Sequence, residues 1–448
     1  MDGTGPDMTS AEITAEITVT VETPAFVAAS GEAPAELRMP SLRGAARYWF
    51  RLLAAPVFAD NPAAVAAAEA EVFGAASGDA GGDGRPGRSR NGRDRSRGPS
   101  RVALRPLQPV PAGHDPQPSW LRGGAGPVNG IGYLLGPGIY QPPGRGGHPG
   151  LLRPHYLPPS QQVEDSPKGT FLVRVLDDGS DVPASYVAEV AGISLWAVAT
   201  FGGIGARVHR GFGGLRFDGL DRLSPALAGA GATPPDHAHP VIQRLHELLA
   251  GRWERPEPPP RPTVRPGVSG PPWPAAPTWS RWYTQFSAER GTWVDRLRAA
   301  GLALRAFRAP VDRYAAPFAM THLPAYRRWV TREYVDAVVP ARAGRPVASP
   351  QFPLAAFGLP VVFQNATANL WRGGTELRRA SPVWIRPHRA NPMDSRGFRL
   401  LYHVLEAQIG PDDAELGLKV QNRAGRVALS LDERAAYRQL DAFLLTAP

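Results

Sequence analysis

Hydrophobic and polar residues alternate along residues 12–21, EITAEITVTV, so that every second side chain is apolar. This period of two is typical of a strand with one buried face. Apolar residues then recur every three or four positions along 42–53, which predicts an amphipathic helix that Ser41 can cap. A second, alanine-rich helix is predicted over 62–73, ending at Gly74. The chain therefore opens with a strand followed by helices.

Further patterns complete the first half of the chain. Short apolar runs predict strands over 128–138, 170–176 and 214–219, and a largely apolar stretch predicts a helix over 185–201. The resulting order is strand, helix, two strands, helix, strand, which is the βαββαβ arrangement of ferredoxin-like or RRM-like domains. The predicted fold class is therefore α+β.

A proline-rich stretch, 256–277, separates the two halves, and we interpret it as a stiff linker. It divides the chain into an N-terminal domain over 1–255 and a C-terminal domain over 278–448. The pattern between 310 and 350 favours neither helix nor strand. The clearest predicted elements of the second domain are helices over 290–307 and 432–445 and strands over 359–364, 381–387 and 398–409.

Residues 78–101 are low in complexity and contain no side chain that could seed a core. We expect a disordered insertion in the first domain. Its seven arginines would attract RNA without specificity. A solvated loop of no set function is the alternative interpretation.

The charge balance points to an anionic partner. The chain has 448 residues, with 50 Lys and Arg against 40 Asp and Glu, which gives a net charge of +10. Such an excess favours nucleic acid. Nearly all the cations are arginine, which forms bidentate contacts with phosphate and stacks on bases. GC-rich coding, which enriches Arg, Ala, Gly and Pro together, is the alternative explanation.

Several other classes of partner and site receive no support from the sequence. The absence of cysteine excludes disulfides, thiolate nucleophiles and Cys-based zinc sites. The sequence has neither a long apolar span nor a basic amphipathic helix, so we expect no membrane partner. The first residues, MDGTGPDMTSAE, lack the charged and apolar regions of a secretory signal, so we expect a cytoplasmic location.

The most informative segment is 201–214, FGGIGARVHRGFGG, in which two pairs of glycines flank a basic turn. Glycine tolerates positive φ and lets another backbone approach, so the pattern suits a loop pressed against a phosphate chain. A turn that only joins a helix to a strand is the alternative. The candidate RNA-binding residues of this loop are Gly203, Gly205, Arg207, His209, Arg210, Gly211 and Gly213.

The loop does not match the nucleotide-binding fingerprints. The dinucleotide pattern would require a third glycine where Val208 stands, and the sequence has no glycine-rich loop ending in Gly-Lys-Ser/Thr. We interpret the loop as a holder of nucleic-acid backbone and expect no cofactor.

Arginine also marks the first predicted helix. Arg43, Arg47 and Arg51 lie four residues apart and therefore face the same way. Arg38 lies just upstream, and the aromatic residues 48–50 interleave with the arginines. Aromatic and arginine side chains together can stack on bases and hold phosphates. A solvated helix face would show the same pattern.

These segments carry a family resemblance. The string PSLRGAARYWFRLLA at 40–54 resembles a helix of RAMP-superfamily CRISPR proteins, and the glycine spacing of 201–214 resembles their glycine-rich loop. In particular, the chain is similar to the first RAMP subunit of type III-B, or Cmr, effector complexes. The segments that carry this closer similarity are 47–53, 132–138, 195–213, 358–363 and 378–386. The insertion over 78–101 and the proline-rich linker depart from the family pattern.

The resemblance implies two tandem ferredoxin-like RAMP domains with long insertions. It also implies a noncatalytic RNA-binding subunit of an antiviral effector complex, which holds the 3′ part of the guide RNA and assists the capture of target RNA. Other RAMP subunits would be its protein partners. Arg378 and Arg379 are weaker candidates for RNA contact, with ion pairing between domains or subunits as the alternative.

Residues of catalytic type do not gather in the sequence. The chain has no HExxH motif and no clustered metal-ligand spacing, so we predict no metal site and no enzyme. The alternative is a metal-independent RAMP endoribonuclease that processes guide RNA with His209 as general base. We favour a histidine that stacks on RNA or hydrogen-bonds to it. A purely architectural subunit is a third hypothesis.

Overall fold

The computed structural model divides the chain into two compact units that are not continuous in sequence. The first comprises 1–113, 156–206 and 213–259, and the second comprises 114–155, 207–212 and 260–448. The described residues are 12–27, 34–59, 61–74, 100–122, 129–136, 138–141, 150–159, 168–230, 239–256, 282–312, 329–347, 350–363, 365–405, 409–410 and 413–448. The predicted insertion lies outside them except for residues 100–101, and the predicted linker except for Pro256. The proposed domain boundaries therefore stay a prediction.

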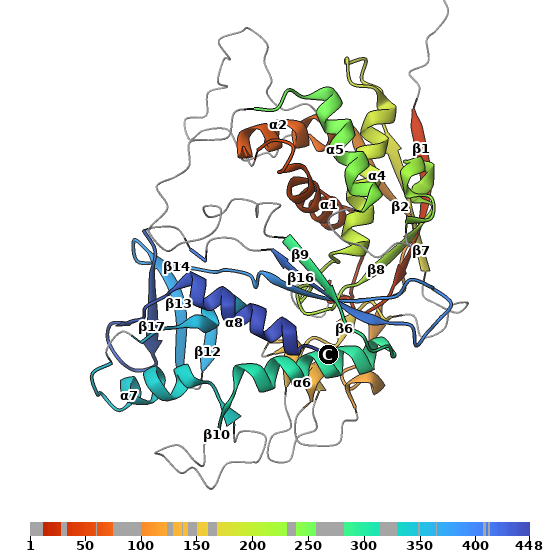
Figure 1. The fold of residues 1–448 in the computed structure, drawn as a ribbon. Helices are drawn as coiled ribbons and strands as arrows, with labels where there is room; N and C mark the ends of the chain where they lie inside the picture. The colour runs from red at the N-terminus through yellow and green to blue at the C-terminus, as the bar shows by residue number, and fades with distance from the viewer. Residues whose placement is uncertain are drawn as a thin grey trace, which may run out of the picture. The chain divides into compact units, whose positions relative to one another are not determined.

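The first unit is built on one antiparallel sheet of four strands in the order β2-β7-β1-β8. Helices α1, α2, α4 and α5 lie on one side of it (Figure 1). The strands are β1 (Ile13–Val21), β2 (Val102–Gln108), β7 (Lys168–Val175) and β8 (Leu215–Asp218). The helices are α1 (Met39–Ala54), α2 (Pro62–Phe73), α4 (Ala184–Thr200) and α5 (Pro240–Arg252).

Alternating burial explains why this sheet forms. In the centre of the sheet Ile17 on β1 pairs with Phe171 on β7, and both side chains are fully buried. The intervening residues, such as Glu16 and Arg174, are exposed on the opposite face. Helix α4 packs against α1, α5 and the sheet, so nearly all its residues are buried. This central position is the reason why α4 is apolar all round.

One strand prediction was wrong. The apolar run within 128–138 forms a short helix, α3 (Gly130–Leu135), which belongs to the second unit. The Asn129 side chain accepts a hydrogen bond from the Gly132 amide and caps this helix. A short apolar run cannot by periodicity alone be assigned to strand or helix, and the local cap decides here.

β2 is the strand of the first unit that the sequence pattern did not predict. Its residues after Val102 are mostly exposed, and it contains Pro106. It lies at the edge of the sheet, where a proline is tolerated because its lost hydrogen bond would face outward. The sequence VALRPLQ therefore shows no alternation, and its strand went unpredicted.

The second unit contains a three-stranded sheet, β15-β16-β9, and a five-stranded sheet, β12-β13-β17-β18 with β14 paired to β13. Helices α6 and α8 pack against each other in this unit (Figure 1). The principal strands are β9 (Trp282–Phe286), β12 (Val361–Phe363), β13 (Ala366–Arg372), β14 (Thr375–Leu377), β15 (Val383–His388), β16 (Arg399–Leu405), β17 (Glu415–Val420) and β18 (Val427–Ala428). The helices are α6 (Trp293–Arg308), α7 (Val339–Arg342) and α8 (Glu433–Thr446), and a π-helical turn spans Tyr334–Val338.

The remaining strands are two-residue pairs: β3 (Gly113–His114), β4 (Tyr140–Gln141), β5 (Gly150–Leu151), β6 (His155–Tyr156), β10 (Val311–Asp312) and β11 (Trp329–Val330). Most of the predicted elements of the second half are confirmed, with ends that differ by a few residues. Helices α6 and α8 and strands β12, β15 and β16 correspond to them. Strands β9, β13, β14, β17 and β18 were not predicted. β14 follows the turn at Gly373-Gly374, and its three residues are too few to show a period.

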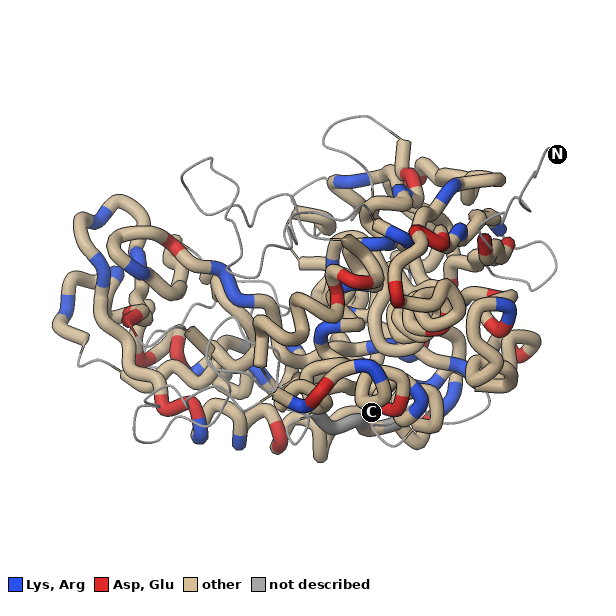
Figure 2. The backbone as a smooth tube through the Cα atoms, turned by 90° about the horizontal axis from the view of Figure 1, so that it is seen from above, with Lys and Arg blue, Asp and Glu red and all other residues tan. Residues whose placement is uncertain are grey.

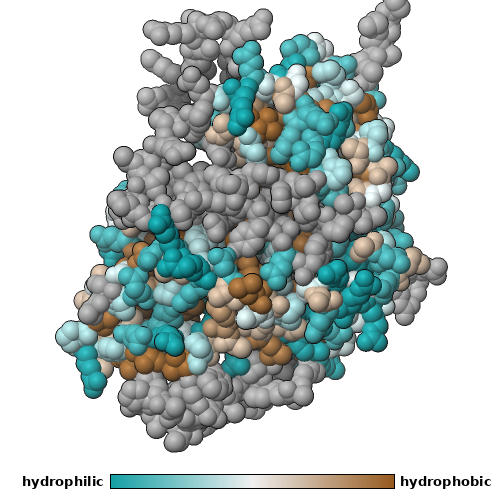
Figure 3. Space-filling view, in the orientation of Figure 1, coloured by the Kyte–Doolittle hydropathy of each residue, from teal (hydrophilic) through white to brown (hydrophobic). Residues whose placement is uncertain are grey.

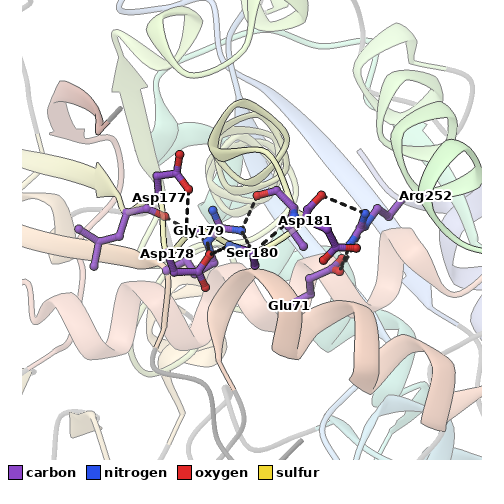
Figure 4. A network of polar contacts seen from close by, with 10 residues as sticks. Glu71, Asp177, Asp178, Gly179, Ser180, Asp181 and Arg252 are labelled. Carbon is purple, nitrogen blue, oxygen red and sulfur yellow. Dashed lines mark hydrogen bonds and ion pairs between the residues drawn. The ribbon is translucent and has the colours of Figure 1, made fainter. Parts of the chain in front are cut away.

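Arginines of the first unit are tied to acidic residues that lie far from them in sequence. Figure 4 shows the loop 177–181 after β7 together with Glu71 of α2 and Arg252 of α5. Arg252 donates to Glu71 at 2.9 Å and to Asp181 at 3.1 Å. The buried Arg101 donates to the Val182 carbonyl at 2.8 Å. These contacts hold α2, α5 and the loop together.

Charge is mixed along the chain, and hydropathy is mixed on the face of the molecule that Figure 3 shows. Figure 2 shows Lys and Arg positions interspersed with Asp and Glu along the backbone. On the face seen in Figure 3, hydrophobic residues form small patches among hydrophilic ones. Within the described ranges, none of the helices combines the length and the apolar character that crossing a membrane requires.

Gly213 provides a test of backbone strain in the first unit. Its φ is +73°, and a Cβ atom there would collide with the carbonyl of Ile204. We expect Gly213→Ala to lower the free energy of unfolding by at least about 1–2 kcal/mol. The matched control is Gly44→Ala in α1, where a Cβ atom would meet no atom within 4 Å. The control should raise stability by up to about 1 kcal/mol, as urea denaturation would show. Equal effects of the two changes would contradict the assignment.

Candidate nucleic-acid interface

The two ends of the glycine loop belong to the first unit and are held by backbone hydrogen bonds. The Ile204 amide donates to Gly213 at 3.0 Å, which closes the loop at its base. The Ala206 amide donates to Phe26 at 3.0 Å, and the Gly213 amide donates to Pro24 at 2.8 Å. The segment after β1 therefore fixes both ends of the loop.

Aromatic side chains pack against the start of the loop. Trp49 of α1 is buried, and its ring centroid lies 5.5 Å from that of Phe201. The indole also lies so close to Gly202 that a Cβ atom there would collide with it. Trp196 of α4 meets Phe201 edge-on at 5.4 Å. This packing places Trp49 in the core and gives Gly202 a structural reason.

The tip of the loop, 207–212, belongs to the second unit. The Arg210 amide donates to the Arg207 carbonyl at 2.8 Å, which closes a turn. Arg207 has φ of +64°, a conformation that costs energy in a residue other than glycine. The Ile385 amide of β15 donates to the His209 carbonyl at 3.1 Å. The turn is therefore docked on the edge of β15.

His209 is occupied by packing within the second unit. Its ring stacks on Trp384 with centroids 3.6 Å apart, and Nδ1–H donates to the Ser381 carbonyl at 2.8 Å. Burial lowers the pKa of His209 to about 4, and nearby Arg210 lowers it further, whereas the bond to Ser381 opposes the shift. The imidazole is therefore neutral near pH 7.

The two arginines of the tip lie among other arginines. Burial lowers the pKa of Arg210 to about 10, with the charges of Arg308 and Arg207 acting in the same direction. Burial, followed by the charge of Arg153, lowers the pKa of Arg207. Burial also lowers the pKa of Arg305, which lies with Arg308 in the last turn of α6. We call Arg153, Arg207, Arg210, Arg305 and Arg308 the arginine cluster.

Direct partners are few for Arg210 and Arg308 of this cluster, although the charge of Arg308 opposes the rise that burial causes in the pKa of Glu333. Arg210 donates to the Phe357 carbonyl at 3.3 Å, and its Nη1 is buried without a hydrogen-bond partner. The Nε of Arg308 is likewise buried and unpartnered. Among the described residues, neither Arg210 nor Arg308 forms a salt bridge. Buried guanidinium groups without carboxylates can be satisfied by phosphate oxygens, which accept bidentate hydrogen bonds.

The arginine stripe of α1 shows the opposite arrangement. Glu69 of α2 is buried and accepts from Arg47, and it lies 3.1 Å from Nε of Arg51. Arg38 lies 3.6 Å from Glu36. Arg43 is the member of the stripe that forms no ion pair with a described residue. Two of the three predicted phosphate contacts on this helix are thus already paired with a carboxylate.

Arg378 and Arg379 differ from each other in burial. Arg378 is exposed, whereas Arg379 is only 5% exposed. Arg379 donates to the Tyr437 hydroxyl at 3.0 Å and to the Ala380 carbonyl at 3.0 Å. The Arg379 side chain therefore anchors α8, which makes it a poor candidate for reaching RNA.

The structure adds residues that the sequence reasoning missed. Arg308 of α6 and Arg153 lie near the loop tip although they are distant in sequence. Arg305 of α6 has Tyr133 as an electrostatic neighbour, as Arg210 does. The sequence did show that Arg305 and Arg308 lie three residues apart on one predicted helix. It could not show which loop this end of the helix approaches. Within the described ranges, the structure contains no group of three His, Cys, Asp or Glu side chains that could hold a metal ion.

The buried histidines predict a pH dependence. Burial lowers the pKa of His209 and His388 to about 4 and that of His403 to about 3, from 6.5. The unfolded chain therefore binds protons that the folded chain does not, and stability should fall as pH drops from about 6.5 towards 4. His209→Gln should reduce this slope by up to about 1.4 kcal/mol per pH unit in urea denaturation. An unchanged slope would contradict the burial of His209.

Glu69 provides a test of the arginine pairing on α1. Its side chain is 5% exposed and serves both Arg47 and Arg51. Glu69→Gln should lower the free energy of unfolding by about 1–3 kcal/mol, because it leaves two arginines beside a neutral group. The control is Glu36→Gln, whose exposed pair with Arg38 should contribute less than about 1 kcal/mol. Thermal unfolding of both variants measures the difference, and equal effects would rule out a structural role for Glu69.

Part of the chain is similar to known proteins. Residues 18–216 match the family model of the RAMP superfamily. A curated relative, CRISPR system Cmr subunit Cmr1-1 from Pyrococcus furiosus, is 27% identical over 181 residues, which cover 40% of each chain. The aligned part is thus less than half of that relative.

Solved structures give a weaker likeness. The apo crystal structure of Cmr1 from Pyrococcus furiosus is 18% identical, covering 97% of this chain and 96% of that one, with a TM-score of 0.43. A type III-B Cmr-beta structure bound to cognate target RNA is 10% identical, covering 97% and 100%, also with a TM-score of 0.43. Both scores are too low to establish a shared overall fold. Residues 18–216 are thus similar to the RAMP superfamily, and the chain is similar in sequence to a Cmr1 subunit of a CRISPR system.

Proposed function

We propose that this chain is a noncatalytic RNA-binding subunit of a type III-B CRISPR effector complex. In this role it holds the 3′ part of the guide RNA and assists the capture of target RNA. Similarity to the Pyrococcus furiosus Cmr subunit and the match to the RAMP superfamily support membership of such a complex. Its partners would be guide RNA, target RNA and other RAMP subunits, in the cytoplasm.

The arginine cluster carries this proposal. Arg210 and Arg308 each bury a guanidinium nitrogen that has no partner, and neither is paired with a carboxylate of the described residues. Bringing like charges together in a partly buried site costs free energy unless an anion neutralises them. A ribose-phosphate chain supplies one anionic oxygen pair per nucleotide, which suits several guanidinium groups side by side.

The other predicted contacts divide into two groups. Arg43 and Arg207 accompany Arg210 as proposed phosphate contacts, since Arg47 and Arg51 already share Glu69. The loop glycines would let the RNA backbone approach the turn, beside their structural role. His209 and Arg379 are proposed to position the loop and α8 rather than to touch RNA.

The order of elements supports tandem ferredoxin-like domains. In the first unit the first three strands lie in the order β2-β7-β1, that is, second, third, first. In the second unit the order along the chain is β9, α6, β15, β16 and α8, once the strands of the five-stranded sheet and the shorter elements are set aside. Its sheet order β15-β16-β9 is again second, third, first. The five-stranded sheet would then be an insertion into the second domain.

An endoribonuclease is less well supported by the geometry. A general base must reach the 2′-hydroxyl that it deprotonates. The His209 ring is covered by Trp384 on one face, and Nδ1–H is already donated to Ser381. These contacts favour a packing role for His209, and so we propose binding without cleavage.

Salt dependence tests the cluster. Arg308→Gln should leave the fold intact and reduce the slope of log affinity against log salt by about 0.7, the value for one phosphate contact on single-stranded RNA. Arg210→Gln is the second variant. The matched control is Arg372→Gln, an exposed arginine of the same unit that pairs with Asp413 at 2.8 Å. Filter binding of labelled guide RNA at several salt concentrations measures the slope.

The outcomes separate the three hypotheses. Unchanged slopes in folded Arg308→Gln and Arg210→Gln proteins would show that the cluster does not bind RNA. Copurification with other effector subunits after nuclease treatment, without RNA affinity, would favour the architectural hypothesis. Cleavage of labelled guide precursor by wild-type protein, lost in His209→Gln, would establish the endoribonuclease instead.

A further inference from the structure

The five-stranded sheet of the second unit has two faces of different character. On β13 Ala368 and Leu370 are buried, and they pair with Leu418 and Leu416 of β17. Because side chains alternate along a strand, Asn369 and Trp371 lie on the other face. Exposed residues from several strands share that face: Glu415, Lys419, Val362, Glu376 and Ala428. This outer face is distinct from the loop tip and from the arginine cluster.

A stacked pair lies on the outer face. Gly417 stands opposite Asn369, and a Cβ atom on it would lie 3.5 Å from Trp371 Cδ1 and 3.6 Å from Trp371 Nε1. The indole therefore lies over the glycine of the neighbouring strand. The guanidinium carbon of Arg426 lies 4.5 Å from the indole centroid. Arg426 is exposed on the turn between β17 and β18, so its side chain can leave the indole without disturbing the core.

Asn369 beside this pair is a polar group without a partner. It is 1% exposed, and neither its Oδ1 nor its Nδ2 has a hydrogen-bond partner. Trp371 Nε1 is likewise buried and unpartnered. Leaving such groups unsatisfied costs free energy, and native proteins keep few of them. Glycine at 417 supplies no side chain that could satisfy the amide.

We propose that Asn369, Trp371 and Arg426 form a nucleobase site on the outer face of this sheet, with adenine as the preferred base. A base entering between Trp371 and Arg426 exchanges one cation–π contact for stacking on the indole and on the guanidinium plane. As the stack rearranges, the Asn369 amide gains partners for one donor and one acceptor. That pair matches the donor and acceptor edge of adenine. The proposal rests on the proposed RNA-binding function for the source of the base.

Base preference at constant salt tests the site in the full-length protein. The probes are oligo(A) and oligo(U) of equal length, and adenosine monophosphate alone. Wild-type protein should prefer oligo(A). Trp371→Leu should weaken oligo(A) binding by about 5- to 150-fold, whereas Trp371→Phe should retain most of it because a ring remains. Asn369→Leu should abolish the preference and raise the melting temperature, because it removes an unsatisfied buried amide.

The control is Arg423→Gln, which removes an exposed charge from the same turn as Arg426 and should affect both oligonucleotides equally. Equal affinity of wild-type protein for the two oligonucleotides, or a preference unchanged in Trp371→Leu and Asn369→Leu, overturns the base site and leaves RNA binding by the cluster untouched. If wild-type protein binds neither oligonucleotide, the proposed function fails. In that case the binding of adenosine monophosphate tests the base site separately. Binding to wild-type protein that is lost in Trp371→Leu supports the site, and absence of binding to wild-type protein overturns it.

Discussion

The desolvation of arginine is the constraint on which much of this structure depends. With 50 basic and 40 acidic residues, the chain must bury guanidinium groups in order to pack its helices and loops. A guanidinium group withdrawn from water is costly unless carbonyls or carboxylates replace the water. The first unit meets this need internally. Glu69 serves Arg47 and Arg51, Glu71 serves Arg252, and Glu189 accepts from Arg244 at 2.9 Å and 3.1 Å.

The second unit meets the same need only in part. Arg210 donates one hydrogen bond, to the carbonyl of Phe357, and Arg308 has no ion pair with a described residue. The loop tip is nevertheless held firmly, because His209 stacks on Trp384 and its carbonyl extends the edge of β15. A rigid turn thus keeps like charges together, a preorganisation that an anionic ligand can use without a further ordering cost. The contrast between the units supports the proposal that phosphate contact falls to this cluster rather than to Arg47 and Arg51 of α1.

Phosphate contact and base contact make different demands on a protein. The arginine cluster offers charge and donors, which give affinity without sequence information. The proposed site at Trp371 offers a ring and an amide, which can distinguish one base from another. The similarity to the RAMP superfamily extends over residues 18–216, and the proposed base site lies outside that range.

The sequence alone was sufficient for elements whose period is long and clear. β1, α1, α4, α6 and α8 were predicted because alternation or helical spacing extends over several turns, and the segments 40–54 and 201–214 together carried the resemblance to the RAMP superfamily. Short pieces were not decided by sequence: an Asn129 cap made 130–135 a helix, and an edge position made VALRPLQ a strand. The same holds for charge. Sequence showed which arginines exist, but only tertiary packing decided that Glu69 neutralises Arg47 whereas Arg210 meets Arg308, because pairing depends on distances between residues far apart in the chain.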